Sequence, residues 1–172
     1  MKTLAINVWT IDEHPNKEAV LETLRNWPNM YGHDYENVAS LKAFCDCFSL
    51  ASLDYEVSTC SPSHATAKID NDLEELRYVR LWKYLQNNFN LAKLLDGSCP
   101  FTGCGFDETL LDPIRVFIKK PTDIDYQELI DNCLSAWVTA YLRDWEYAYS
   151  DEALTETAEC NEWYFTGSGE LE

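Results

Sequence analysis

The sequence predicts a helix-rich α+β fold with a small, mainly antiparallel sheet. Apolar residues recur at helical spacing over long stretches, above all between residues 123 and 149. Residues 53–59 and 65–69 instead alternate apolar and polar side chains, as the two strands of a β-hairpin do. The 172 residues are 46% hydrophobic and 13% aromatic, a composition that suits one folded domain over residues 1–172.

The N-terminal part is expected to hold a strand, two helices and the hairpin. Residues 4–11 alternate as a strand, and residues 17–27 form a short amphipathic helix that ends before a proline. A polar loop, 30–36, leads into a second helix at 37–50. The hairpin follows, with its turn at residues 61–63.

The remainder is expected to be mainly helical. Asp72, with Glu75 in capping-box position, begins a long helix that ends near Leu95. Residues 112–120 fit either a helix that starts with a proline or an alternating strand. Residues 123–149 form the longest helix, and its broad apolar stripe is expected to carry the core.

The last thirty residues, 143–172, are expected to form an acidic C-terminal helix and strand. Ser150 caps a helix over residues 151–160, whose first turn is acidic, as the helix dipole favours. Residues 163–166 form a short closing strand. Arg143 is the last basic residue of the chain.

A net charge of −17 is the strongest compositional feature. Thirty acidic residues stand against thirteen basic ones. This charge opposes direct binding to nucleic acid or to an anionic membrane, because cations are needed to displace the counterions of phosphates. It favours a basic protein as partner. The chain shows no apolar stretch near the ~18 residues of a membrane span and no signal peptide. Its seven cysteines, an odd number, suggest free thiols in a reducing cytoplasm.

The loop Cys99-Pro-Phe-Thr-Gly-Cys104 is the most metal-like feature. Its two cysteines have the spacing of a zinc knuckle, but Cys45 and Cys47 do not, so we expect no metal. The alternative is a tight loop with half-buried thiols, followed by a short turn that Asp107 caps. No nucleotide-binding, metalloprotease or EF-hand motif is present. We therefore expect no cofactor and no enzymatic activity.

Carboxylates and aromatic residues of the C-terminal stretch are the candidate functional surface. Glu152, Glu156 and Glu159 follow an i, i+4, i+7 pattern and share a helix face. Like charges at i and i+4 destabilise a helix, so this row suggests a basic partner; the alternative is a solvated face. Tryptophans are favoured interface anchors. The candidate partner-binding residues are Asp144, Trp145, Glu146, Asp151, Glu152, Glu156, Glu159, Glu162 and Trp163.

Three parts of the chain resemble small, uncharacterised acidic proteins of bacteriophages and prophages. They are residues 3–20, the loop 99–104, and residues 144–154 with 161–166. The resemblance implies a protein made in the cytoplasm of an infected bacterium, and it brings no active site. Small acidic phage proteins of this kind often inhibit host defences such as restriction enzymes, CRISPR complexes or recombination nucleases, and several act as DNA mimics.

Three hypotheses follow. The first is a non-enzymatic anti-defence inhibitor that binds a basic, nucleic-acid-handling host protein (a nuclease, restriction enzyme or CRISPR component) through its acidic C-terminal surface. The second is a protein that sequesters a small molecule or signal nucleotide, for which Arg77, Arg80 and Lys83 are the candidate cations. The third is a regulatory or assembly protein that forms a homodimer through its aromatic stripe.

Overall fold

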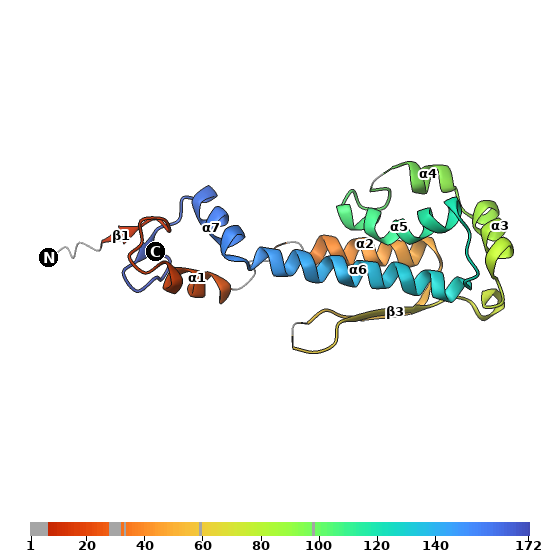
Figure 1. The fold of residues 1–172 in the computed structure, drawn as a ribbon, viewed down its shortest axis with the longest axis horizontal. Coiled ribbons are helices and arrows are strands. Elements are labelled where there is room, and N and C mark those ends of the chain that lie inside the picture. Colours follow the sequence, from red (N-terminus) through yellow and green to blue (C-terminus); the bar gives the residue numbers. More distant parts are fainter. Residues whose placement is uncertain (1–6, 28–31, 33, 59, 98) are drawn as a thin grey trace. The chain divides into compact units, whose positions relative to one another are not determined.

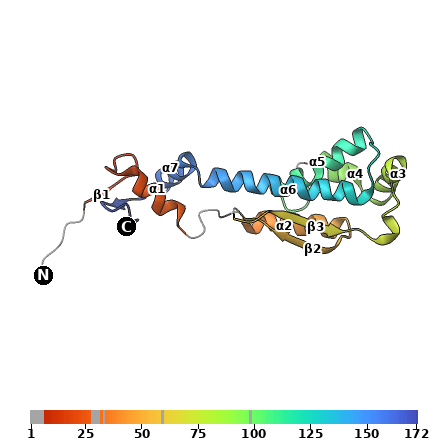
Figure 2. The same cartoon turned by 60° about the horizontal axis from the view of Figure 1, so that its bottom comes forward.

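The protein is a helix-rich α+β chain, which confirms the predicted class (Figures 1 and 2). The computed structural model describes residues 7–27, 32, 34–58, 60–97 and 99–172. These residues form seven α-helices, one 3-10 turn and two antiparallel sheets of two strands each. Within them, no helix is both long and apolar enough to cross a bilayer.

The chain divides into two compact units. Unit 1 combines the two ends of the chain, residues 1–32 and 144–172, and unit 2 comprises residues 33–143. Helix α6 (Tyr126–Ala148) belongs to unit 2 up to Arg143 and to unit 1 from Asp144 onward. That the whole chain is one domain stays a prediction.

Unit 1 pairs a strand from each end of the chain. Its elements are β1 (Val8–Trp9), α1 (Lys17–Arg25), α7 (Asp151–Cys160) and β4 (Phe165–Thr166). β1 and β4 are antiparallel, with Val8 opposite Thr166 and Trp9 opposite Phe165. Of the predicted strand 4–11, only Val8–Trp9 is a strand among the described residues, and residues 4–6 lie outside them. Both helices start at side-chain caps, since Asn16 and the predicted Ser150 accept from the amides of Ala19 and Ala153.

The core of unit 1 closes around the C-terminal turn of the chain. Its buried side chains come from both ends of the chain: Ile11, Val20, Leu21, Leu24, Leu154, Ala158 and Phe165. Trp163 and Leu171 pack against this cluster. Gly169 has a φ of +87°, and a Cβ at this position would lie 2.9 Å from the carbonyl carbon of Ala19. The turn therefore needs glycine both for its backbone conformation and for its close approach to α1.

Unit 2 is built from helices packed with one hairpin. Its elements are α2 (Asp34–Cys47), β2 (Ala51–Glu56), β3 (His64–Lys68), α3 (Tyr78–Asn88), α4 (Leu91–Asp96), α5 (Gly105–Lys119) and most of α6. Figures 1 and 2 both show α2 alongside α6, and the buried Trp137 of α6 donates to the carbonyl of Asn37 at 3.0 Å. The predicted hairpin is confirmed, and Gln127 of α6 bonds to the backbone of Ala67 and Ile69 at its edge.

The predicted helix from Asp72 to Leu95 is wrong, because the chain is interrupted twice. A 3-10 turn (Asn71–Leu73) capped by Asp70 is followed by an extended segment, where Arg77 forms a β-bridge with Asp125. A second break falls at Phe89, which is extended, and Asn90 then caps α4. Both breaks serve contacts distant in sequence, which helical spacing does not encode.

The ambiguous stretch 112–120 is helical and belongs to α5. Ile114 and Phe117 are buried, in line with Leu110, whereas Val116 is 66% exposed. The buried positions thus follow the helical period of three to four residues, not the alternation of a strand. Pro113 lies inside this helix.

Candidate functional site

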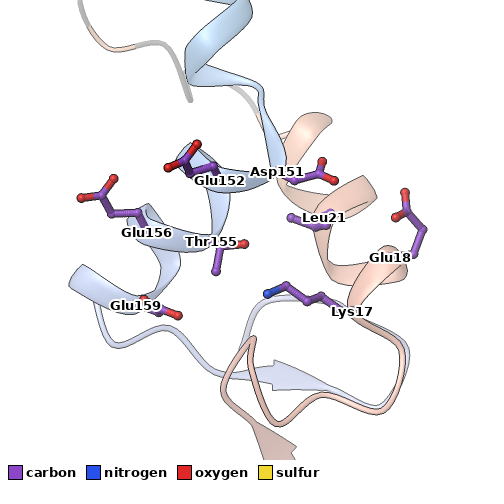
Figure 3. Close-up of a pocket in the computed structure, with 8 residues that line it drawn as sticks. All are labelled: Lys17, Glu18, Leu21, Asp151, Glu152, Thr155, Glu156 and Glu159. Carbon is purple, nitrogen blue, oxygen red and sulfur yellow. The ribbon is translucent and has the colours of Figure 1, made fainter.

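An acidic groove lies between α1 and α7 in unit 1 (Figure 3). Its volume is ≈ 770 Å³. Eight residues line it, three from α1 and five from α7: Lys17, Glu18 and Leu21, and Asp151, Glu152, Thr155, Glu156 and Glu159. The lining thus holds five carboxylates and one ammonium group, a net charge of −4 when all are ionised.

The amphipathic pattern of α7 explains why its carboxylates reach this groove. Ala153, Leu154 and Ala158 face the core of unit 1. Glu152, Glu156 and Glu159 occupy the other positions of the same turns and are exposed. Because the apolar side is fixed against the core, the acidic side is held on a rigid element rather than on a loop.

Arg25 joins the two helices that form the groove. Its guanidinium contacts the carboxylate of Glu18 at 3.0 Å and also bonds to that of Asp151. Arg25 donates both hydrogen bonds, and they raise its pKa, the bond to Glu18 having the larger effect. Two of the five groove carboxylates are therefore already paired with a cation of the protein itself.

Glu159 and Asp12 form a second cluster, with Lys17. The carboxyls of Asp12 and Glu159 are hydrogen bonded, which raises the pKa of Glu159 and lowers that of Asp12. Lys17, whose ammonium lies 3.3 Å from Asp12 Oδ1, further lowers the pKa of Asp12. A proton taken up by this pair therefore resides on Glu159.

Glu152 and Glu156 differ from the other groove carboxylates. Within the part of the chain that the structure describes, neither makes an ion pair or a side-chain hydrogen bond. In Figure 3 their carboxylates point away from α1, whereas Lys17 extends toward α7. These two like charges stand one helical turn apart, and Glu156 also repels the carboxylate of Glu159.

The structure brings together four of the nine predicted partner-binding residues. Asp151, Glu152, Glu156 and Glu159 line the groove. The other five do not line it: Asp144, Glu146 and Glu162 are exposed, Trp145 stacks on Tyr149 with ring centroids 4.5 Å apart, and Trp163 packs against the core of unit 1.

Sequence reasoning missed the contribution of α1 to the groove. Lys17 and Glu18 line it, and Asp12 and Arg25 pair with its residues. Arg25 and Asp151 are 126 residues apart in the chain. The acidic cap of α7 was visible in the sequence, but no local pattern indicates which helix packs beside it.

The loop between Cys99 and Cys104 is organised by a buried carboxylate. Asp107, fully buried in the first turn of α5, accepts from the backbone amides of Phe101, Thr102 and Gly103 at 2.8, 2.7 and 3.3 Å. The Thr102 hydroxyl also donates to it, at 3.0 Å. This geometry supports the tight-loop interpretation. Among the described residues, no group of three or more His, Cys, Asp or Glu could hold a metal ion.

The cations of the nucleotide-binding hypothesis are exposed, with Arg80 and Lys83 on α3 and Arg77 at its N-cap. Arg77 lies 3.8 Å from the carboxylate of Asp123. That hypothesis and the homodimer hypothesis stay predictions.

No family model, curated protein or solved structure matches this chain. The groove itself is therefore the basis for any statement about function.

Proposed function

We propose that this protein is a non-enzymatic, phage-encoded inhibitor of a bacterial defence system. It acts in the cytoplasm of the host and binds a basic, nucleic-acid-handling protein through the acidic groove of unit 1. The observation that carries the proposal is the unpaired couple Glu152 and Glu156, which a rigid helix displays beside an already acidic groove.

The spacing of these carboxylates supports a DNA-mimicking role. Four residues of α-helix rise by about 6 Å, and phosphates along one DNA strand recur every ~3.4 Å of helix axis. Glu152 and Glu156 are thus offset by about as much as two successive phosphate steps. A protein groove lined with arginine and lysine to hold a phosphate backbone offers cations at such intervals.

The charge of the groove supports fast electrostatic association. Complementary potentials steer partners together and raise association rates, an effect that salt screens within a Debye length of about 10 Å at 0.1 M. Glu18 and Asp151 are paired with Arg25, so they contribute less to this field than the two unpaired glutamates.

A capture experiment from bacterial lysate tests the proposal. The tagged protein, Glu152→Lys/Glu156→Lys and the matched control Glu74→Lys/Glu75→Lys are each washed at about 0.1 M and about 0.5 M salt. The control makes the same change in net charge on exposed residues of unit 2. We expect a basic nuclease, restriction or CRISPR component on the wild-type protein and the control, lost at high salt, and absent from the groove variant.

Two results would count against this function. Equal loss in both variants would mean that total charge, not the groove, recruits the partner. Retention by the groove variant at high salt would place the interface elsewhere in the molecule. Folding of each variant is checked by the urea midpoint, so that a lost partner is not mistaken for a lost fold.

A further inference from the structure

His14 is a buried histidine that joins the segment before α1 to β4 within unit 1. Its side chain is 6% exposed. The ring atom Nε2 lies 2.7 Å from the carbonyl oxygen of Thr166, and the backbone amide of Asn16 bonds to Nδ1 at 3.0 Å. Both ring nitrogens are therefore hydrogen bonded, and the bond to Thr166 joins residues that are 152 positions apart in the chain.

The two partners fix the tautomer of the ring. A carbonyl oxygen can only accept, so Nε2 must carry the proton in its bond to Thr166. A backbone amide can only donate, so Nδ1 must be bare to accept from Asn16. The geometry thus requires the neutral imidazole with its proton on Nε2, and a doubly protonated ring would set two N–H donors against each other at Nδ1.

The surroundings of the ring offer no compensation for a positive charge. From β1, Trp9 meets the ring edge-on with centroids 5.7 Å apart. From β4 and from the loop before α1, the contacts are the carbonyl of Thr166 and the amide of Asn16. Among the described residues, no carboxylate bonds to this ring. The acidic neighbours in sequence, Asp12 and Glu13, are exposed, and Asp12 pairs with Lys17.

The position of His14 couples this bond to the start of α1. Asn16 is the N-cap of α1, and its side chain accepts from the amide of Ala19. The amide that His14 accepts from thus belongs to the residue that begins the helix. Lys17, the next residue, already lines the acidic groove.

We propose that His14 is a proton-sensitive latch that holds the N-terminus of α1 to β4 only while its ring is neutral. Uptake of a proton at Nδ1 removes the acceptor of the Asn16 amide. The bond from Nε2 to Thr166 persists, so the ring stays on β4 while the Asn16 amide, at the start of α1, loses its connection to the ring. Acidification supplies this proton, and the latch is released once the ring has taken it up. This inference does not depend on which partner the groove binds.

Nuclear magnetic resonance of the uniformly ¹⁵N-labelled full chain tests the latch directly. At about pH 7.5 the long-range ¹H–¹⁵N spectrum should show His14 as one tautomer, protonated at Nε2. After correction for intrinsic exchange rates, the Asn16 amide should lose protection by about tenfold or more near pH 5, as expected when its hydrogen bond to the ring is lost. His14→Gln offers a donor and an acceptor without titrating, so it should abolish this loss.

The matched control is His64→Gln in unit 2, where the ring pairs with Asp54 and is not part of unit 1. It should leave the acid response of the Asn16 amide unchanged. Two results would overturn the proposal: a mixture of His14 tautomers at neutral pH, or an Asn16 amide equally protected at both pH values. The tautomer measurement needs no variant, so it decides the question even if His14→Gln fails to fold.

Discussion

Replacing Gly169 by alanine should unfold or severely weaken unit 1. Two separate costs apply at this position. The φ of +87° places an L-residue in the left-handed region, at about 1–2 kcal/mol. The new Cβ would also lie 2.9 Å from the carbonyl carbon and 3.0 Å from the oxygen of Ala19, and 3.0 Å from the nitrogen of Val20.

These clashing atoms are backbone atoms inside α1, so a side-chain rotation cannot relieve the overlap. Overpacking of this kind costs about 1–3 kcal/mol. The total is therefore about 2–5 kcal/mol, a large part of the ~5–15 kcal/mol that stabilises a typical domain.

The assay is native-state hydrogen exchange, read at the amides of α1 and α7, because it reports the opening of each region separately. Two matched controls separate the two costs. In Gly167→Ala the Cβ would meet only the Trp9 ring, at 3.5 Å, so we expect little change. Gly103 has a φ of +85° with open space around it, so Gly103→Ala should cost unit 2 only the conformational ~1–2 kcal/mol. Protection in Gly169→Ala equal to that in Gly167→Ala would refute the reasoning.

Three further predictions concern buried and coupled groups. Asp107→Asn should destabilise unit 2 by about 1.5–3 kcal/mol in urea unfolding, because a charge-assisted acceptor of three backbone amides becomes a neutral amide; an unchanged midpoint would contradict the role assigned to this carboxylate. Because the pKa of Glu159 is raised, its contribution to stability is full at low pH and is lost as the pH rises through that pKa. Because the pKa of Asp12 is lowered, its contribution is lost as the pH falls through that pKa. The hydrogen bond between Asp12 and Glu159 is therefore strongest at a mildly acidic pH, between the pKa values of the two carboxyls. Urea midpoints measured from about pH 4 to about pH 8 should fall at the higher pH values in the wild-type protein. Glu159→Gln should remove this decline, whereas Glu152→Gln should not. Burial raises the pKa of Cys45 to about 11 and also raises that of Cys133. Iodoacetamide at neutral pH should therefore label the exposed Cys60 and Cys160 first, as peptide mass mapping would show. Early labelling of Cys133 would contradict its burial.

The sequence was sufficient where local chemistry determines local structure. Ser150 and the acidic turn that follows predicted the start of α7, and alternation predicted the hairpin, because caps and periodicity act over a few residues. The helix predicted from Asp72 failed because the bridge between Arg77 and Asp125 is a tertiary contact that helical spacing cannot reveal.

The candidate site divides along the same line. The glutamate row of α7 could be predicted, since its period places the three side chains on one face. The other wall of the groove could not, because Lys17 and Glu18 reach it only through the packing of the two chain ends into one core. The aromatic pattern also suggested Trp163 as an interface anchor. Its neighbours are instead the apolar side chains of that core, a contact that the sequence does not indicate.

Building unit 1 from both ends of the chain also governs when it can exist during synthesis. Arg25 can pair with Asp151 only after 126 further codons have been translated. At the usual ~5–20 residues per second, translation leaves α1 without its partner for about 6 to 25 s. Unit 2 is contiguous in sequence and is complete before α7 is made, although its α2 also waits for α6, since Asn37 and Trp137 are 100 residues apart. A ribosome that stalls or terminates before α7 would therefore release a chain that has no groove, with the apolar side of α1 left open to chaperones and proteases.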